Sequence, residues 1–172
     1  MKNYQNNQNA PVLLPENLDW SQAILQDGNT RPTTLSKELI NNYLAAWYQV
    51  RIDTTSLIML RIGSQSKSVA TLLQATRSQN AAYITACNPT SQMAMPEENQ
   101  SATIRLHEQL ARYSNYIYPG ESIDPSGKWP AEASFLALGI DLATIVTIGH
   151  VFGQNAIVWM NTDTIPRLVL LR

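Results

Sequence analysis

Hydrophobic residues recur along this chain at two spacings, one typical of amphipathic helices and the other typical of strands. The helical spacing predicts four helices, over residues 36–47, 66–76, 96–113 and 141–152. Ser36 and Asp141 are suited to cap the first and last of these, and Ser66 or Ser68 can cap the second. Pro96 suits the first turn of the third helix, because proline is tolerated there.

Six shorter apolar segments predict strands, over residues 55–62, 81–86, 115–118, 133–140, 155–160 and 168–171. The first is apolar on both faces, which favours a central place in a sheet. The last two could pair as a hairpin, and residues 120–130 are expected to form a loop. This order of elements predicts an α+β fold, a mixed sheet of about five or six strands packed with three or four helices.

The N-terminal residues 1–34 are rich in Asn, Gln, Pro and Thr and hold few periodic apolar positions. Such a composition hardly offsets the entropy of ordering, so we expect a flexible tail or a docking arm. A short helix near residues 18–26 is an alternative. Residues 35–172 are then expected to form a single globular α+β domain.

Charge and cysteine content narrow the range of functions and locations that the sequence allows. The formal net charge is −1 and only 15% of residues are charged, which argues against nucleic-acid binding through a basic surface. A single cysteine excludes an internal disulfide and fits a reducing, cytoplasmic location. The polar N-terminus has no apolar leader segment. The long apolar stretch 133–160 contains Asp141 and His150, so we expect no membrane span.

Three kinds of cofactor-binding or catalytic motif are absent from the sequence. It has no glycine-rich phosphate loop, no metal-ligand spacing and no nucleophile elbow, so neither a cofactor nor a metal is predicted. Cys87 follows an apolar strand and is expected in the core. His107 should lie at the edge of a buried helix face, and His150 near a helix end, where a cation favours the dipole.

Polar side chains gather where the strand 81–86 ends. Asn88 and Ser91 follow this strand, and ligands often bind where sheet strands open onto a crevice. Asn99 lies in the first turn of the next helix, on its inward stripe, close to the turn that carries Asn88. The alternative is an ordinary turn in which both amides bond to nearby backbone.

A second polar group flanks two other strands. Glu132 stands at the start of one apolar strand, and Gln154 and Asn155 precede another. A carboxyl group beside apolar surface has a raised pKa and suits a general acid or base. The alternatives are a surface pair between Glu132 and Lys128, and a left-handed helix exit at the two amides.

Several of these segments together resemble a known family. The residues that show the resemblance are 60–63, 82–91, Asn99, Trp129, Glu132, Ser134, 152–159 and 168–172. In this order they are similar to the bacterial domain-of-unknown-function family 3293, over about residues 43–172. The chain departs from that pattern at Cys87, where the family usually has an aromatic residue. The resemblance implies a small bacterial, cytoplasmic protein and brings no activity with it.

The sequence therefore predicts a domain that binds a small polar ligand, a nucleotide or an amide-type metabolite. Its site would be formed by Asn88, Ser91, Asn99, Glu132, Gln154 and Asn155. If it is an enzyme, Glu132 would handle a proton in hydrolysis or group transfer. A protein–protein interaction module without chemistry is the main alternative, and binding of RNA or single strands by Trp and Tyr stacking is a weaker one.

Overall fold

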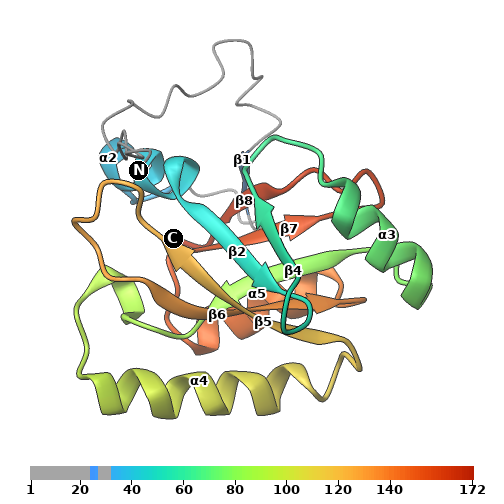
Figure 1. Ribbon diagram of the computed structural model, residues 1–172. Coiled ribbons are helices and arrows are strands. Elements are labelled where there is room, and N and C mark those ends of the chain that lie inside the picture. The colour runs from blue at the N-terminus through green and yellow to red at the C-terminus, as the bar shows by residue number, and fades with distance from the viewer. Residues whose placement is uncertain (1–23, 27–31) are drawn as a thin grey trace, which may run out of the picture.

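The computed structural model describes residues 24–26 and 32–172, which form one sheet flanked by helices (Figure 1). The α-helices of this part are α2 (Lys37–Ala45), α3 (Lys67–Thr76), α4 (Pro96–Leu110) and α5 (Leu142–Val151), with a short 3-10 helix η1 (Pro89–Ser91). The strands are β1 (Ile24–Gln26), β2 (Trp47–Arg51), β3 (Leu57–Leu60), β4 (Ala81–Thr85), β5 (Ile117–Ile123), β6 (Glu132–Leu138), β7 (Ala156–Met160) and β8 (Arg167–Leu170). The α+β class and the number of helices agree with the prediction.

The sheet has eight strands in the order β1-β8-β7-β4-β6-β5-β2-β3. All neighbours from β8 to β3 are antiparallel, and β1 joins the edge parallel to β8, so the sheet is mixed. The predicted hairpin between the last two strands is present as β7 and β8. At the centre, β4 pairs with β6, and Thr85 lies opposite Ser134.

Each face of the sheet has its own hydrophobic core. Along β4, Ala81 and Tyr83 belong to the core beneath α2 and α3, whereas Ala82 and Ile84 belong to the core beneath α4 and α5. Because successive strand residues point to opposite faces and residues 81–84 are all buried, β4 is covered on both sides. The sheet therefore lies between two helical layers in its central part, and α4 lies along one side of it (Figure 1).

The predicted helix starts are confirmed. Ser36, Ser66 and Asp141 each accept a hydrogen bond from a backbone N–H in the first turn, at 3.2, 3.3 and 2.8 Å. Pro96 occupies the first turn of α4. These side chains satisfy backbone donors that would otherwise have no partner within the helix.

The strand count was predicted too low. The pattern extended the first helix to Trp47, but α2 ends at Ala45 and Trp47 begins β2. On β2, Tyr48 and Val50 are buried while their neighbours are not, which is strand alternation. Trp47 falls at the next helical position after the apolar stripe of α2, although it already belongs to β2. The spacing of the apolar residues therefore could not show where the helix ends. The other extra strand is β1.

Two predictions near the sheet edge were also wrong. β3 is an edge strand rather than a central one, and its second apolar face leaves Leu57 51% and Met59 43% exposed. The expected loop 120–130 is strand up to Ile123, because Gly120 pairs with both Val50 and Ser134.

The segment predicted as a tail or arm contributes β1, which pairs with β8. Ile24–Gln26 is therefore strand and not part of a short helix. Residues 1–23 and 27–31 lie outside the described residues. Within the described part, none of the helices has the length and apolar character needed to cross a bilayer.

Candidate functional site

The two central strands bring Asn88 and Glu132 together. Asn88 follows the end of β4, and Glu132 begins β6, its antiparallel neighbour. The end of one antiparallel strand and the start of the next meet at the same edge of a sheet. The Nδ2 group of Asn88 donates a hydrogen bond of 2.8 Å to Oε1 of Glu132. The sequence-predicted acid and amide thus share one site.

The loop that carries Asn88 has an unusual backbone. Asn88, Thr90 and Ser91 have φ angles of 46°, 58° and 56°, in the left-handed region that disfavours most side chains. Oδ1 of Asn88 accepts from the backbone of Ala94 and from Nδ2 of Asn99, both at 3.0 Å. Oδ1 of Asn99 in turn accepts from the backbone N–H of Asn88 at 2.8 Å. The two amides therefore hold this strained loop in place.

Glu132 is a half-buried carboxyl group with one committed oxygen. Its Oε1 accepts from Asn88 and from the indole Nε1 of Trp129, each at 2.8 Å. Its Oε2 accepts from no residue that the structure describes. Burial raises the pKa of Glu132, and the hydrogen bonds from Asn88 and Trp129 offset only part of that rise. One carboxyl oxygen therefore remains for a ligand.

The alternative of a pair between Glu132 and Lys128 is not seen. Within the described part of the chain, the ion pair found joins Arg167 to Asp163. No cation therefore compensates the Glu132 carboxylate there, which agrees with the raised pKa.

Trp129 is positioned by Asp124, which sequence reasoning did not select. Oδ2 of Asp124 accepts from the backbone N–H groups of Lys128 and Trp129 at 3.0 Å, and Oδ1 accepts from that of Ser126 at 2.8 Å. Burial acts to raise the pKa of Asp124, but these hydrogen bonds outweigh it and lower the pKa. The Asp-Pro-Ser-Gly sequence at 124–127 is a turn signal that could have indicated this loop.

A second polar cluster consists of Tyr43, Ser91 and Asn155. The hydroxyl groups of Tyr43 and Ser91 are 2.8 Å apart, and Nδ2 of Asn155 donates to both, at 3.2 and 3.0 Å. The cluster joins α2, the loop after β4 and the residue before β7. Sequence reasoning did not select Tyr43, because an aromatic residue on an apolar helix stripe has the same pattern whether it fills the core or lines a site.

Gln154 has a structural role. It is buried, and its Nε2 donates to the carbonyl of Cys87 at 3.1 Å. The backbone N–H of Thr90 donates to the carbonyl of Gly153 at 2.9 Å. The loop after β4 and the loop before β7 are therefore fixed to each other. Cys87 is buried, as predicted.

These groups surround a cavity of about 480 Å³, within the range of small-molecule sites. Asn88, Ser91, Glu132 and Gln154 line it, whereas Asn99 and Asn155 support it from behind. Its further walls are mainly aromatic and aliphatic: Tyr43, Tyr48, Tyr83, Ile84, Ile123, Trp129, Ala156, Ile157, Val158 and Leu168. The charged residues among its described lining are Asp124 and Glu132, both acidic.

Two of the wall tyrosines are not acid–base groups. The hydroxyl of Tyr48 donates to the carbonyl of Tyr43 at 2.6 Å, and that of Tyr83 donates to the carbonyl of Gln49 at 3.1 Å. Burial raises the pKa of both phenols above the ordinary value. Both phenols remain neutral at physiological pH, so neither exchanges a proton with a ligand there.

A metal is not indicated. Among the residues that the structure places, no group of three or more His, Cys, Asp or Glu side chains could hold a metal ion. The lining amides, hydroxyls and single acid are suited to hydrogen bonding with an organic ligand.

Fold and cavity together define an α+β domain with an aromatic-walled, amide-rimmed cavity. Residues 84–157 match the model of the family described as "Protein of unknown function (DUF3293)", so this segment is similar to that family. No curated protein and no solved structure matched the chain. The matched segment includes Asn88 and Glu132, whereas Tyr43 lies before it.

Proposed function

We propose that this domain binds a small, uncharged polar molecule in the 480 Å³ cavity and that Glu132 exchanges a proton with it. The observation that carries the proposal is the Glu132 carboxyl group, which lines the cavity with one oxygen held by Asn88 and Trp129. Its other oxygen accepts from none of the residues that the structure describes. A protonated carboxyl group donates through that second oxygen, and a carboxylate accepts through it.

The charges of the cavity favour one ligand class. Asp124 lines the cavity and its pKa is lowered, so a phosphate group would meet a carboxylate of like charge and no guanidinium or ammonium group from the described lining. Of the ligands expected from the sequence, an amide-type metabolite or a free nucleobase therefore fits better than a nucleotide. Trp129 and the tyrosine walls suit a flat, weakly polar body.

The chemistry that fits is hydrolysis or group transfer with Glu132 as the acid. In hydrolysis of an amide, the water oxygen bonds to the acyl carbon and the carbon–nitrogen bond breaks. Glu132 gives its proton to the leaving nitrogen and regains one from the attacking water, so the acid is unchanged. Group transfer would replace water by another hydroxyl or amine.

The experiment is a thermal-shift screen of the full chain against neutral amides, nucleosides and their charged analogues. A ligand at one hundred times its dissociation constant stabilises the fold by about 2.7 kcal/mol, which is readily measured. E132Q keeps the shape of the side chain but cannot exchange a proton. E121Q changes an exposed glutamate on the neighbouring strand β5 and serves as the matched control.

We expect neutral hits that stabilise the wild type and E121Q by equal amounts and stabilise E132Q less. Hits confined to anionic compounds, or an equal shift in E132Q, would contradict the proposal. Turnover of a hit that is lost in E132Q but retained in E121Q would establish the acid–base role.

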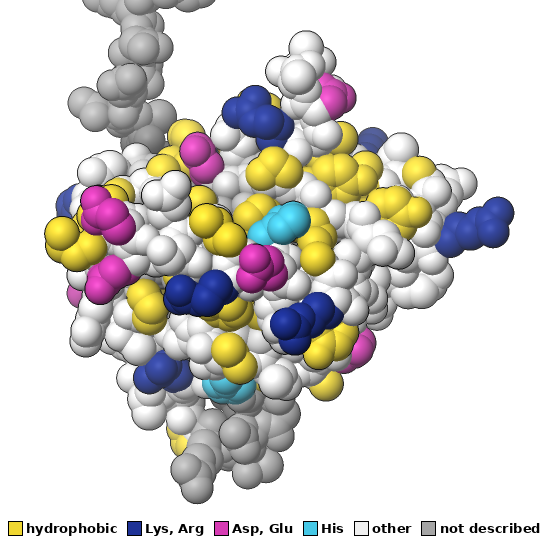
Figure 2. Space-filling view, turned by 90° about the horizontal axis from the view of Figure 1, so that it is seen from below, with side chains coloured by type: hydrophobic (Ala, Val, Ile, Leu, Met, Phe, Trp, Pro, Cys, Tyr) yellow, Lys and Arg dark blue, Asp and Glu magenta, His cyan; other side chains and the backbone are white. Residues whose placement is uncertain are grey.

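One observation favours the alternative of an interaction module. Among the described strands, β3 pairs on one side only, with β2, and it exposes Leu57 and Met59, which suits strand addition by a partner. M59K should abolish such an association and leave ligand hits unchanged. The face seen in Figure 2 intersperses Lys and Arg with Asp and Glu, which does not favour nucleic-acid binding.

The buried, free Cys87 fits a reducing compartment, and we infer a cytoplasmic location from it.

A further inference from the structure

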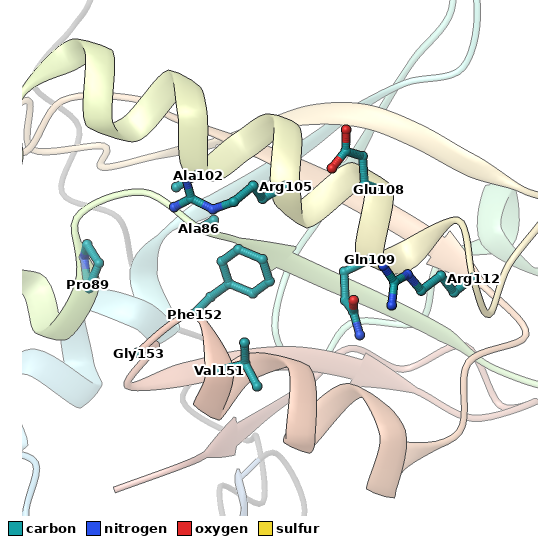
Figure 3. A pocket seen from close by; sticks show the side chains of 10 residues that line it. All are labelled: Ala86, Pro89, Ala102, Arg105, Glu108, Gln109, Arg112, Val151, Phe152 and Gly153. Carbon is teal, nitrogen blue, oxygen red and sulfur yellow. The ribbon is translucent and has the colours of Figure 1, made fainter.

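A groove of about 560 Å³ separates α4 from α5 on the face of the sheet opposite α2 and α3 (Figure 3). On the α4 side, Ala102, Arg105, Gln109 and Arg112 line it. On the α5 side, Val151 and Phe152 line it, and Phe152 extends between the two helices in Figure 3. The groove is separate from the cavity that Glu132 faces.

The sequence of α4 explains why the groove stays open. Leu106 and Leu110 are buried against the sheet, as expected for the inner stripe. Arg105 and Gln109 lie one turn apart on α4, and Arg112 lies in the turn just after the helix; all three line the groove. Two helices on one sheet face usually close on each other through apolar side chains. Here long polar side chains occupy that position, and Val151 is left 72% exposed.

The charges of the groove are unbalanced. Neither Arg105 nor Arg112 forms an ion pair with any residue that the structure describes. Glu108, the acid of this lining, turns to the other side of α4 in Figure 3, whereas Gln109 points towards α5. A guanidinium group presents paired N–H donors that match a carboxylate, sulfonate or phosphate. The apolar surface of Phe152 and Val151 lies within the same groove.

We propose that this groove is a second binding site, for a small organic anion with an apolar body. Arg105 and Arg112 supply the positive charge that attracts the anionic group, and the apolar body lies against Phe152 and Val151. The proposal does not depend on a ligand in the Glu132 cavity, whose charged lining residues are acidic. It adds a second site, for an anionic ligand, on the opposite side of the two loops that border the cavity. Pro89 and Gly153 line the groove, whereas Thr90 and Gln154 line the cavity.

The test uses the full chain and two fluorescent probes. One is 8-anilinonaphthalene-1-sulfonate, an aromatic anion, and the other is N-phenyl-1-naphthylamine, its uncharged analogue. The groove variant is R105Q/R112Q, and the matched control is R51Q/R77Q, which removes two exposed arginines elsewhere. A thermal unfolding scan of each variant shows that the fold is retained, as expected for exposed side chains.

We expect saturable binding of the sulfonate probe to the wild type and to the control. R105Q/R112Q should weaken it by about tenfold or more and leave binding of the uncharged probe unchanged. F152A should weaken both probes. Equal sulfonate binding by R105Q/R112Q and the wild type, or no saturable binding to the wild type, would overturn the proposal.

Discussion

Replacement of Asn88 tests the loop on which the cavity depends. N88A removes three side-chain hydrogen bonds, to Ala94, Asn99 and Glu132. At about 1 kcal/mol each, their loss costs about 3 kcal/mol. Alanine must also adopt a φ of 46°, at about 1–2 kcal/mol. The free energy of unfolding should therefore fall by about 4–5 kcal/mol.

N88G separates the two contributions. Glycine loses the same hydrogen bonds but takes the left-handed conformation without steric cost. Its greater freedom in the unfolded chain costs about 0.5–1 kcal/mol. We therefore expect N88G to be more stable than N88A by about 1 kcal/mol, although both are less stable than the wild type.

Urea unfolding followed by tryptophan fluorescence at pH 7 measures these differences. A loss below about 1 kcal/mol in N88A would show that the amide contacts contribute little, since their sum should exceed that value. N88A equal to or more stable than N88G would refute the left-handed conformation of this residue.

Three further predictions concern single positions. G120A should lose about 1–3 kcal/mol or more in urea unfolding, because a Cβ atom there would lie 2.2 Å from the carbonyl oxygen of Gln49. R77G should gain up to about 1 kcal/mol in the same assay, because Arg77 ends α3 with a φ of 55°. For Glu132 the folded-state pKa is raised, so the wild type loses stability as pH rises from the ordinary value of 4.5 through the folded-state pKa. The free energy of unfolding of E132Q relative to wild type, measured by urea unfolding from pH 4 to pH 8, should therefore increase with pH between 4.5 and the folded-state pKa. The slope there approaches about 1.4 kcal/mol per pH unit, and a flat difference would contradict this.

Local signals in the sequence were sufficient to predict most of the helices and the central strands. Ser36 and Asp141 fix their helix starts through hydrogen bonds within three residues, so no knowledge of the rest of the fold is needed. Strand alternation on β2 was missed, because the apolar stripe of α2 continues in phase to Trp47. The edge position of β3 depends on which strands pair, which its own composition does not determine.

The candidate site was predictable only in part. Asn88 and Glu132 were selected because each flanks an apolar strand, but their contact requires that β4 pair with β6 and not with β5. That pairing is non-local. Tyr43 has the same pattern as a core residue, and its hydroxyl finds its partners only through non-local contacts, with Ser91 and Asn155.

The central claim is that Glu132 is an uncompensated acid facing a cavity. The most direct measurement is a pH titration of the Glu132 side-chain carboxyl carbon by ¹³C NMR, with E132Q used to assign the resonance. The account predicts a midpoint above the ordinary value of 4.5, because burial outweighs the two hydrogen bonds to Oε1. A midpoint at or below 4.5 would show a solvated or cation-paired carboxylate, and the proposed proton-exchange site would be wrong.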